Sequence, residues 1–377
     1  MTDVRPPMIA PARPDLPTWW HADPSILAFP RSSATSSPPQ LYQFGDGVLQ
    51  LHTPYARLRD ALARVYAESA ISKVSPAAIR LTAHAYPVPH SSLLRLRFEC
   101  GADFDFVDVA LGLLQNHHPE HSVHDSPVRG WRLISRVAAP DSPLLAVSGA
   151  DTLIDTIEEP PEFLVNYLIA TLMRLQAQML FMHAGSMSIG GRGILLAGKT
   201  HAGKTTTTLT LASRGHGFLG DDVAAIRINS RELVPFLRAA SIRPAPRSAR
   251  LERLIAQHAY PSETLPDGTR RTWLRVTSVL PRASSAPAPL RAAFFLRGFA
   301  ANPACESFDP SLQNYIEVLK VLSYEHTVSA SWGLAAGRRL MRFATLSSIL
   351  KHVPCYLLDA GTTEDTADFI ETTMEKL

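Results

Sequence analysis

One short glycine-rich segment holds the residues whose types and spacing point most directly to chemistry. Residues Gly198–Thr205 read Gly-Lys-Thr-His-Ala-Gly-Lys-Thr and satisfy the phosphate-binding pattern G-x-x-x-x-G-K-[ST] in full. In such a loop, backbone N–H groups surround the phosphates, the lysine bridges two of them and the hydroxyl binds Mg²⁺. The segment predicts ATP and Mg²⁺ as cofactors, with Lys204 as a catalytic cation and Thr205 as a metal ligand. The residues expected to bind the nucleotide are Gly198, Lys199, Thr200, His201, Ala202, Gly203, Lys204, Thr205 and Thr206.

The flanking residues predict the elements that must position this loop. Gly193–Ala197 is an apolar run typical of a buried strand, and it ends at the first glycine. Thr205–Ser213 has the apolar spacing of a helix, whose positive end would point at the bound anion. A strand, a glycine-rich loop and a helix in this order indicate an α/β core.

Three further side chains could act on an acceptor hydroxyl. Asp221 and Asp222 end a short apolar segment after the loop, and His183 starts a strand-like segment before it. Because adjacent side chains of an extended chain point in opposite directions, one aspartate can face a metal and the other the acceptor. The alternatives are that the aspartates cap a turn after Gly220 and that His183 is a core residue.

The block "MHAGSMSIGGRGILLAGKTHAGKTTTTLTLASRGHGFLGDDVA" closely resembles the catalytic core of the HPr kinase/phosphorylase family. The shared features are Met182–Ala184, the phosphate-binding loop, Arg214–His216 and the aspartate pair, in that order. The resemblance implies an α/β fold in which a P-loop HPr-kinase C-terminal-like (phosphoenolpyruvate-carboxykinase-like) catalytic domain follows an N-terminal α+β domain. It also implies that Asp221 is the general base, with His183 as its partner, and that Asp222 binds Mg²⁺.

The sequence departs from this family after the aspartate pair. The family continues with a Glu-Ile-Arg-Gly-type segment that contains a metal-binding glutamate. The segment here reads "ELVPFLRAASIRPAPRSARLER", in which we cannot place that glutamate, so a reverse, phosphorolytic reaction stays open. The pattern looks more like HPr-kinase-related proteins of peptide-tailoring systems, including kinases of lasso-peptide precursors.

The arginines of that segment offer a second kind of recognition. Guanidinium groups bind phosphates and carboxylates in a bidentate manner, and we expect exposed Arg243 and Arg247 to contact phosphate or an acidic peptide. Trp19 and Trp20 interrupt a proline- and serine-rich N-terminal arm and could add apolar contact area. The alternatives are a solvated basic face and an arm that docks on the protein itself.

Composition shifts divide the chain into an arm (1–40), an N-terminal α+β domain (41–155) and a P-loop kinase domain (156–377). Within the second region, the "HHPEHSVH" segment is expected to be a solvated loop, with metal binding as the alternative. The elements expected in this region are the strands Val48–His52, Ile79–Ala83, Leu93–Phe98, Arg129–Val137 and Leu144–Val147 and the helices Tyr55–Ser69 and Phe106–Leu114.

Bulk properties narrow the setting. The 377 residues carry a formal net charge of only +3, which does not favour a nucleic-acid partner. Three cysteines without a C-x-x-C pair are typical of a reducing compartment. We find no signal sequence and no apolar stretch suited to a membrane, so we expect a cytoplasmic protein without a membrane partner. A homo-oligomer stays open.

These features favour an ATP-dependent kinase that phosphorylates a Ser, Thr or Tyr hydroxyl of a peptide or protein. One alternative is a kinase for a small-molecule hydroxyl. Another is a non-catalytic nucleotide-binding regulator, although such a protein would not need His183 and Asp221. A carboxykinase lacks support, because the sequence shows no second-metal Lys/His constellation.

Overall fold

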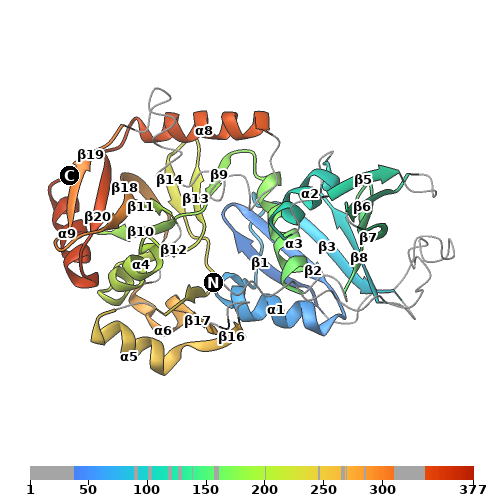
Figure 1. The fold of residues 1–377 in the computed structure, drawn as a ribbon, viewed down its shortest axis with the longest axis horizontal. Coiled ribbons are helices and arrows are strands. Elements are labelled where there is room, and N and C mark those ends of the chain that lie inside the picture. The colour runs from blue at the N-terminus through green and yellow to red at the C-terminus, as the bar shows by residue number, and fades with distance from the viewer. Residues whose placement is uncertain are drawn as a thin grey trace, which may run out of the picture.

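The computed structural model describes residues 38–377, except for 89–91, 101–103, 118–120, 126–129, 138, 157–160, 200, 245–246, 265–267, 269, 284–285 and 310–335. Trp19, Trp20 and Thr200 therefore lie outside the described residues. Two assemblies of sheet and helix lie side by side (Figure 1). None of the described helices is long and apolar enough to cross a membrane.

The first assembly is an eight-stranded sheet with three helices packed on one face. All strand pairs are antiparallel except β2 with β3. In spatial order the strands are β1 (Gln40–Phe44), β2 (Gly47–His52), β3 (Ile79–Pro87), β4 (Leu93–Glu99), β8 (Asp151–Asp155), β7 (Ala139–Ser148), β6 (Arg132–Arg136) and β5 (His121–Asp125). The helices are α1 (Ala56–Tyr66), α2 (Phe106–His117) and α3 (Pro161–Leu175), with a short 3-10 turn, Ala67–Ser69, after α1. The expected α+β character of this region is confirmed.

The apolar residues of α1, α2 and α3 share one core with the inner face of this sheet. The phenol ring of Tyr167 on α3 meets the ring of Phe98 on β4 edge to face, with centroids 5.5 Å apart. The helix that follows the predicted boundary at residue 155 thus packs on the sheet that precedes it. The division of the chain into domains at that residue stays a prediction.

The histidine-rich segment differs from its prediction as a loop. Residues His121–Asp125 form β5, which pairs antiparallel with β6 along its whole length. The pairing partner lies about ten residues further along the chain, so local composition did not reveal it. Among the described residues, no group of three or more His, Cys, Asp or Glu side chains could hold a metal ion.

The second assembly is a nine-stranded sheet that positions the phosphate-binding loop. Its main path runs through β12 (Gly217–Gly220), β10 (Gly185–Ile189), β11 (Arg192–Gly198), β18 (Ala288–Phe299), β14 (Glu232–Val234), β13 (Ala224–Arg227) and β9 (Met179–Met182). β20 (Cys355–Ala360) pairs with β18 and with β19 (Ala304–Ser307). The strands β11, β18 and β20 run parallel, so their carboxyl ends meet at one edge of the sheet.

Helices cover both faces of this sheet because neighbouring strand residues point to opposite sides. Ile194 and Leu196 of β11 pack with α4 (Lys204–Ser213) and α9 (Thr363–Glu375). Leu195, between them, packs with α8 (Ala336–Leu350). The predicted strand and helix around the loop are both confirmed.

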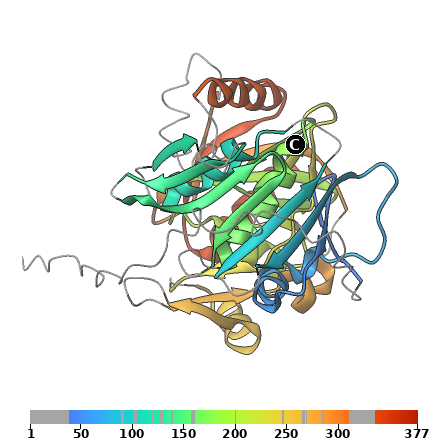
Figure 2. The same ribbon diagram turned by 90° about the vertical axis from the view of Figure 1, so that its right-hand side faces the viewer.

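A small three-stranded sheet completes the fold: β15 (Ala240–Ile242), β17 (Arg270–Leu274) and β16 (Tyr260–Thr264). It is accompanied by α5 (Ala249–His258), α6 (Val276–Val279) and a 3-10 turn, Pro281–Ala283. Arg275 donates from Nη2 to the backbone oxygen of Ala63 at 3.0 Å, which ties this unit to α1. Two views at right angles place α8 and α5 at opposite ends of the molecule (Figures 1 and 2).

Candidate active site

The loop between β11 and α4 needs glycine at both ends. Gly198 has φ 150°, and a Cβ there would lie 2.5 Å from the backbone oxygen of Leu296. Gly203, just before α4, adopts φ 95°, which L side chains rarely tolerate. The glycines of the sequence pattern are thus required by a close strand contact and by a left-handed backbone.

Lys204 is held inside this loop. Its side chain is almost fully buried, and Nζ donates to the backbone oxygens of Gly198 at 2.8 Å and Lys199 at 3.0 Å. Burial lowers the pKa of Lys204, while the charges of Asp222 and Asp221 act in the opposite direction. The ammonium group thus lies at the start of α4 and in the field of both aspartates.

Asp221 is buried against α4. Its residue is only 2 % exposed, and Thr208 Oγ1 donates to Asp221 Oδ1 at 3.0 Å. Burial and, to a smaller extent, the charge of Asp222 raise the pKa of Asp221 to about 6, although hydrogen bonds from Thr208 and Thr205 act against both. The carboxylate thus faces the two hydroxyls of α4, one of which belongs to the phosphate-binding motif.

Asp222 points to the other side and remains about one-third exposed. His183 Nδ1 lies 2.9 Å from Asp222 Oδ1, and Arg238 forms an ion pair with Oδ2. Burial alone would raise the pKa of Asp222, but Arg238 and His183 hold it well below its usual range. The resemblance implied that His183 partners Asp221. The structure corrects this pairing, because the two aspartates diverge from a bend and only Asp222 faces His183.

Arg238 was missed as a site residue because it looked like one member of an arginine run. Its guanidinium carbon lies 5.8 Å from the ring centroid of Tyr66 and 5.3 Å from that of Trp273. Cation–π contacts of this kind hold a guanidinium group in place. Arg238 therefore links Asp222 to α1 and to the three-stranded sheet, and no sequence pattern predicted this.

A cavity of about 680 Å³ joins most of the predicted site residues. Those that line it are His183, His201, Gly203, Lys204, Thr205, Thr206, Asp221, Asp222, Arg243 and Arg247. Gly198, Lys199 and Ala202 belong to the loop but do not line the cavity. Phe299 and residues 360–364 also line it, together with Thr366, further residues of α4 and the segment around residues 241–248.

The two predicted arginines occupy different environments. Arg243 lines the cavity and its Nη1 lies 3.2 Å from His201 Nε2. Arg247 was expected to be exposed, but its side chain is only 7 % exposed and pairs with Glu252 at 3.0 Å. The guanidinium group of Arg247 also donates to the backbone oxygen of Arg243, so local protein contacts occupy it before α5 begins.

The residues near the loop fit a hydrated divalent cation. Magnesium is commonly held by one or two protein oxygen ligands together with phosphates and water. Thr205 and Asp221 would supply these oxygens, since the buried Asp221 carboxylate accepts hydrogen bonds from the neutral hydroxyls of Thr208 and Thr205. A divalent cation would compensate that charge.

No family model matches the chain. It is similar to the HPr kinase/phosphorylases of Polaromonas naphthalenivorans (strain CJ2), at 33 % identity over 121 residues, and of Polaromonas sp. (strain JS666 / ATCC BAA-500), at 30 % over 132 residues. That of Chlorobium limicola (strain DSM 245 / NBRC 103803 / 6330) is 41 % identical over 69 residues, covering 18 % of this chain and 21 % of its own length.

The chain covers 38 % and 42 % of the lengths of the two Polaromonas proteins, about two-fifths of each. A solved structure of the HPr(Ser) kinase/phosphatase from Coxiella burnetii gives a TM-score of 0.26 at 14 % identity, covering 52 % of this chain and 88 % of the other. By sequence, the chain is similar to HPr kinase/phosphorylases over 28 % to 31 % of its length.

Proposed function

We propose that this chain is an ATP-dependent phosphotransferase that phosphorylates a hydroxyl group of a peptide or protein. One observation carries the proposal: a partly exposed carboxylate, Asp222, shares a cavity with the phosphate-binding lysine and is oriented by His183 and Arg238. A protein that only binds and releases a nucleotide has no need for such an oriented group. Transfer to a hydroxyl requires one.

The environments of the two aspartates support a division of labour opposite to the one that the resemblance implied. Asp222 is accessible, so we assign it the role of binding the acceptor hydroxyl. Its carboxylate accepts a hydrogen bond from this hydroxyl, orients it and takes up its proton late in transfer. Asp221 is buried beside Thr205 and Thr208, where a carboxylate of a P-loop protein holds Mg²⁺.

The remaining groups act on the phosphates. Lys204 would exchange its two loop carbonyl partners for oxygens of the β- and γ-phosphates, with the N–H groups at the start of α4 beside them. Thr205 and Asp221 would hold Mg²⁺, which would supply positive charge to offset the negative charge of the phosphates. His183 Nδ1 also lies 2.9 Å from the backbone oxygen of Asp222, which fixes its proton on Nδ1 and its ring beside the carboxylate.

The names of the relatives and the position of Arg243 favour a peptide or protein acceptor. The relatives are named as kinases of HPr. On this chain, Arg243 lines the cavity beside the loop and could contact an acidic segment of a peptide. The experiment must separate this proposal from two alternatives. One is a kinase whose small-molecule acceptor is held within the cavity, and the other is a regulator that transfers no phosphate.

The experiment compares Asp222→Asn with Asp221→Asn in Mg·ATP binding and in phosphate transfer. Candidate peptides and small alcohols are incubated with the enzyme, and a gain of about 80 Da, the mass of HPO₃, is sought by mass spectrometry. We expect Asp222→Asn to bind Mg·ATP like the wild type and to lose roughly 10²–10⁴ in transfer rate. Asp221→Asn should instead require a higher Mg²⁺ concentration to reach the same fraction of enzyme with bound Mg·ATP.

Asp151→Asn is a matched control, because this carboxylate pairs with Arg95 in the eight-stranded sheet, outside the cavity. It should leave both readouts unchanged. If Asp221→Asn lost transfer at saturating Mg·ATP while Asp222→Asn altered only metal dependence, the roles would revert. Phosphorylation of small alcohols alone would refute the peptide acceptor, and ATP binding without transfer to any acceptor would refute the kinase.

A further inference from the structure

Phe299 is an aromatic side chain left in contact with solvent beside the phosphate-binding loop. It is 68 % exposed at the end of β18. The other large apolar side chains that the described residues leave exposed are Val137, Met341 and Leu377, and none of them lines the cavity. An exposed aromatic ring at the wall of a cavity is a common feature of ligand sites.

The sheet places Phe299 across the loop from the aspartates. β12 leads to Asp221 and Asp222, β18 leads to Phe299, and β11 with its loop lies between them in the order β12, β10, β11, β18. The ring also touches the loop region, because a Cβ added to Gly203 would lie 3.4 Å from Phe299 Cζ. A triphosphate held by Lys204 would have its transferable end near Asp222 and its nucleoside end near Phe299.

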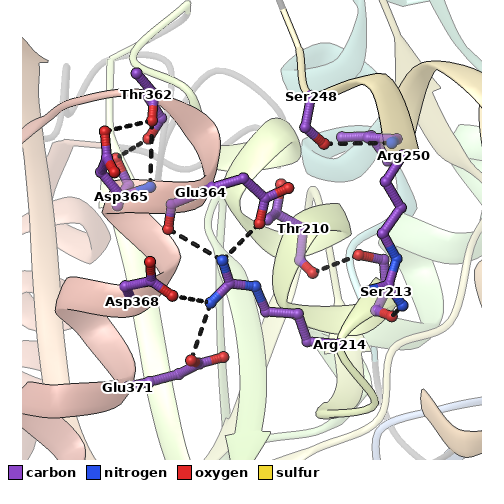
Figure 3. A network of polar contacts seen from close by, with 12 residues as sticks. Thr210, Ser213, Arg214, Ser248, Arg250, Thr362, Glu364, Asp365, Asp368 and Glu371 are labelled. Carbon is purple, nitrogen blue, oxygen red and sulfur yellow. Dashed lines mark hydrogen bonds and ion pairs between the residues drawn. The ribbon is translucent and has the colours of Figure 1, made fainter.

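The part of the wall that the start of α9 forms is fixed by ion pairs between α4 and α9. Figure 3 shows Arg214, at the end of α4, reaching three carboxylates of α9. Its Nη2 lies 2.5 Å from Glu364, and its Nη1 lies 2.6 Å from Asp368 and 3.0 Å from Glu371. The first turn of α9, which lines the cavity, is thereby tied to the helix that follows the phosphate-binding loop.

Several polar groups of this wall already have protein partners. Thr362 Oγ1 donates to Asp365 Oδ2 at 2.6 Å, Thr366 Oγ1 accepts from Gly361 N at 3.0 Å, and Glu364 pairs with Arg214. These side chains are therefore engaged before a ligand arrives. Contact with the face of an aromatic ligand is what exposed Phe299 adds beside these engaged groups.

We propose that Phe299 is the platform on which the base of a bound purine nucleoside triphosphate stacks. The inference rests on the proposed function, because the triphosphate must occupy the loop. Stacking contributes affinity but distinguishes poorly among bases, since every base has a π-face. The site should therefore accept ATP and GTP with similar affinity and bind both more tightly than the same triphosphate without a nucleoside.

The test measures dissociation constants for ATP, GTP and inorganic tripolyphosphate with Mg²⁺, on the full chain. Phe299→Ala should weaken ATP and GTP binding on the order of 10-fold and leave tripolyphosphate binding unchanged. Phe299→Trp should retain nucleotide affinity, and Phe299→Leu, apolar but without a π-face, should fall between. Met341→Ala, another exposed apolar side chain but outside the cavity, should change nothing.

Three outcomes would overturn the stacking role: unchanged ATP affinity in Phe299→Ala, an equal loss for tripolyphosphate, or a loss confined to one purine. Each of these leaves the phosphate-binding loop intact as a triphosphate site. Failure of the wild type to bind any of the three probes would instead refute the proposed function, and the stacking role with it.

Discussion

The eight-stranded sheet and the P-loop sheet treat buried polar groups differently. In the first, two contacts pair buried polar side chains within the protein: Thr152 Oγ1 lies 3.0 Å from Tyr167 Oη, and Arg95 pairs with Asp151 at 3.1 Å. In the second, Lys204 and Asp221 are equally buried but meet only neutral partners in their direct hydrogen bonds. In the first region these polar groups stabilise the fold. In the second, we expect the two buried charges to interact with the proposed ligand.

This difference has a physical cost. A buried carboxylate without an ion-pair partner disfavours its charged form, and the raised pKa of Asp221 reflects that. Sites that bind charged ligands commonly retain such strain, since the ligand relieves it. We therefore expect substitutions in the two regions to separate activity from stability.

The largest effect should come from Lys204→Ala, which removes the phosphate-bridging cation and should lower transfer on the order of 10³-fold. Its lost partners are two loop carbonyls, so the thermal unfolding midpoint should stay close to that of the wild type. Turnover and calorimetry on the same samples measure both. Wild-type turnover in this variant would remove the loop from the mechanism.

Leu58→Ala should give the reverse pattern. Leu58 on α1 is fully buried in the core of the eight-stranded sheet, and its truncation should lower the free energy of unfolding by roughly 2–5 kcal/mol. Transfer at low temperature should be unchanged. Urea unfolding measures the loss of stability. The transfer rate is measured at about 10–15 °C, near the temperature of maximum stability of most proteins, so that the variant stays folded. A matching loss of rate in folded protein would show that the two regions are not separable.

Asp221→Asn should stabilise the protein at high pH in the absence of metal. The folded pKa of Asp221, about 6, exceeds its ordinary value of 3.8, so the folded state binds more protons than the unfolded state between them. Wild-type stability therefore falls as pH rises through this window, and the full cost, up to about 3 kcal/mol, applies above pH 6. The variant lacks this cost.

Urea unfolding with a chelator should show a gain from Asp221→Asn that is about three times larger at pH 8 than at pH 4.5, because only part of the cost is present at the lower pH. Asp151→Asn is the opposite control at pH 8, because it removes a carboxylate that pairs with buried Arg95 at 3.1 Å and should destabilise. A constant difference between Asp221→Asn and the wild type at the two pH values would contradict the raised pKa.

The smallest effect should come from Tyr167→Phe. The hydroxyl of Tyr167 contacts Thr152 at 3.0 Å and donates to the backbone oxygen of Phe106 at 3.3 Å. Its loss should cost about 0.5–1.5 kcal/mol of stability and leave ATP affinity unchanged. Denaturant titration and nucleotide binding test this. A change in ATP affinity would mean that α3 communicates with the cavity.

Local patterns predicted the elements around the loop because their signals are local. The run before Gly198, the glycines and the apolar spacing after Lys204 each depend on neighbouring residues, and β11 and α4 formed where they were expected. The prediction of a loop for the histidine-rich segment was wrong for the complementary reason. β5 forms by pairing with β6, which is not part of the segment.

By itself, the sequence determined the phosphate-binding loop and the candidate chemistry of His183, Asp221 and Asp222, since these follow from residue types and short spacings. Only the tertiary structure decided which aspartate meets His183 and that Arg238 completes their cluster. Only it brought Phe299 and the start of α9 to the same cavity. These placements depend on the direction of side chains at a bend and on strand order. Both arise when segments far apart in the chain pack together, which no local pattern encodes.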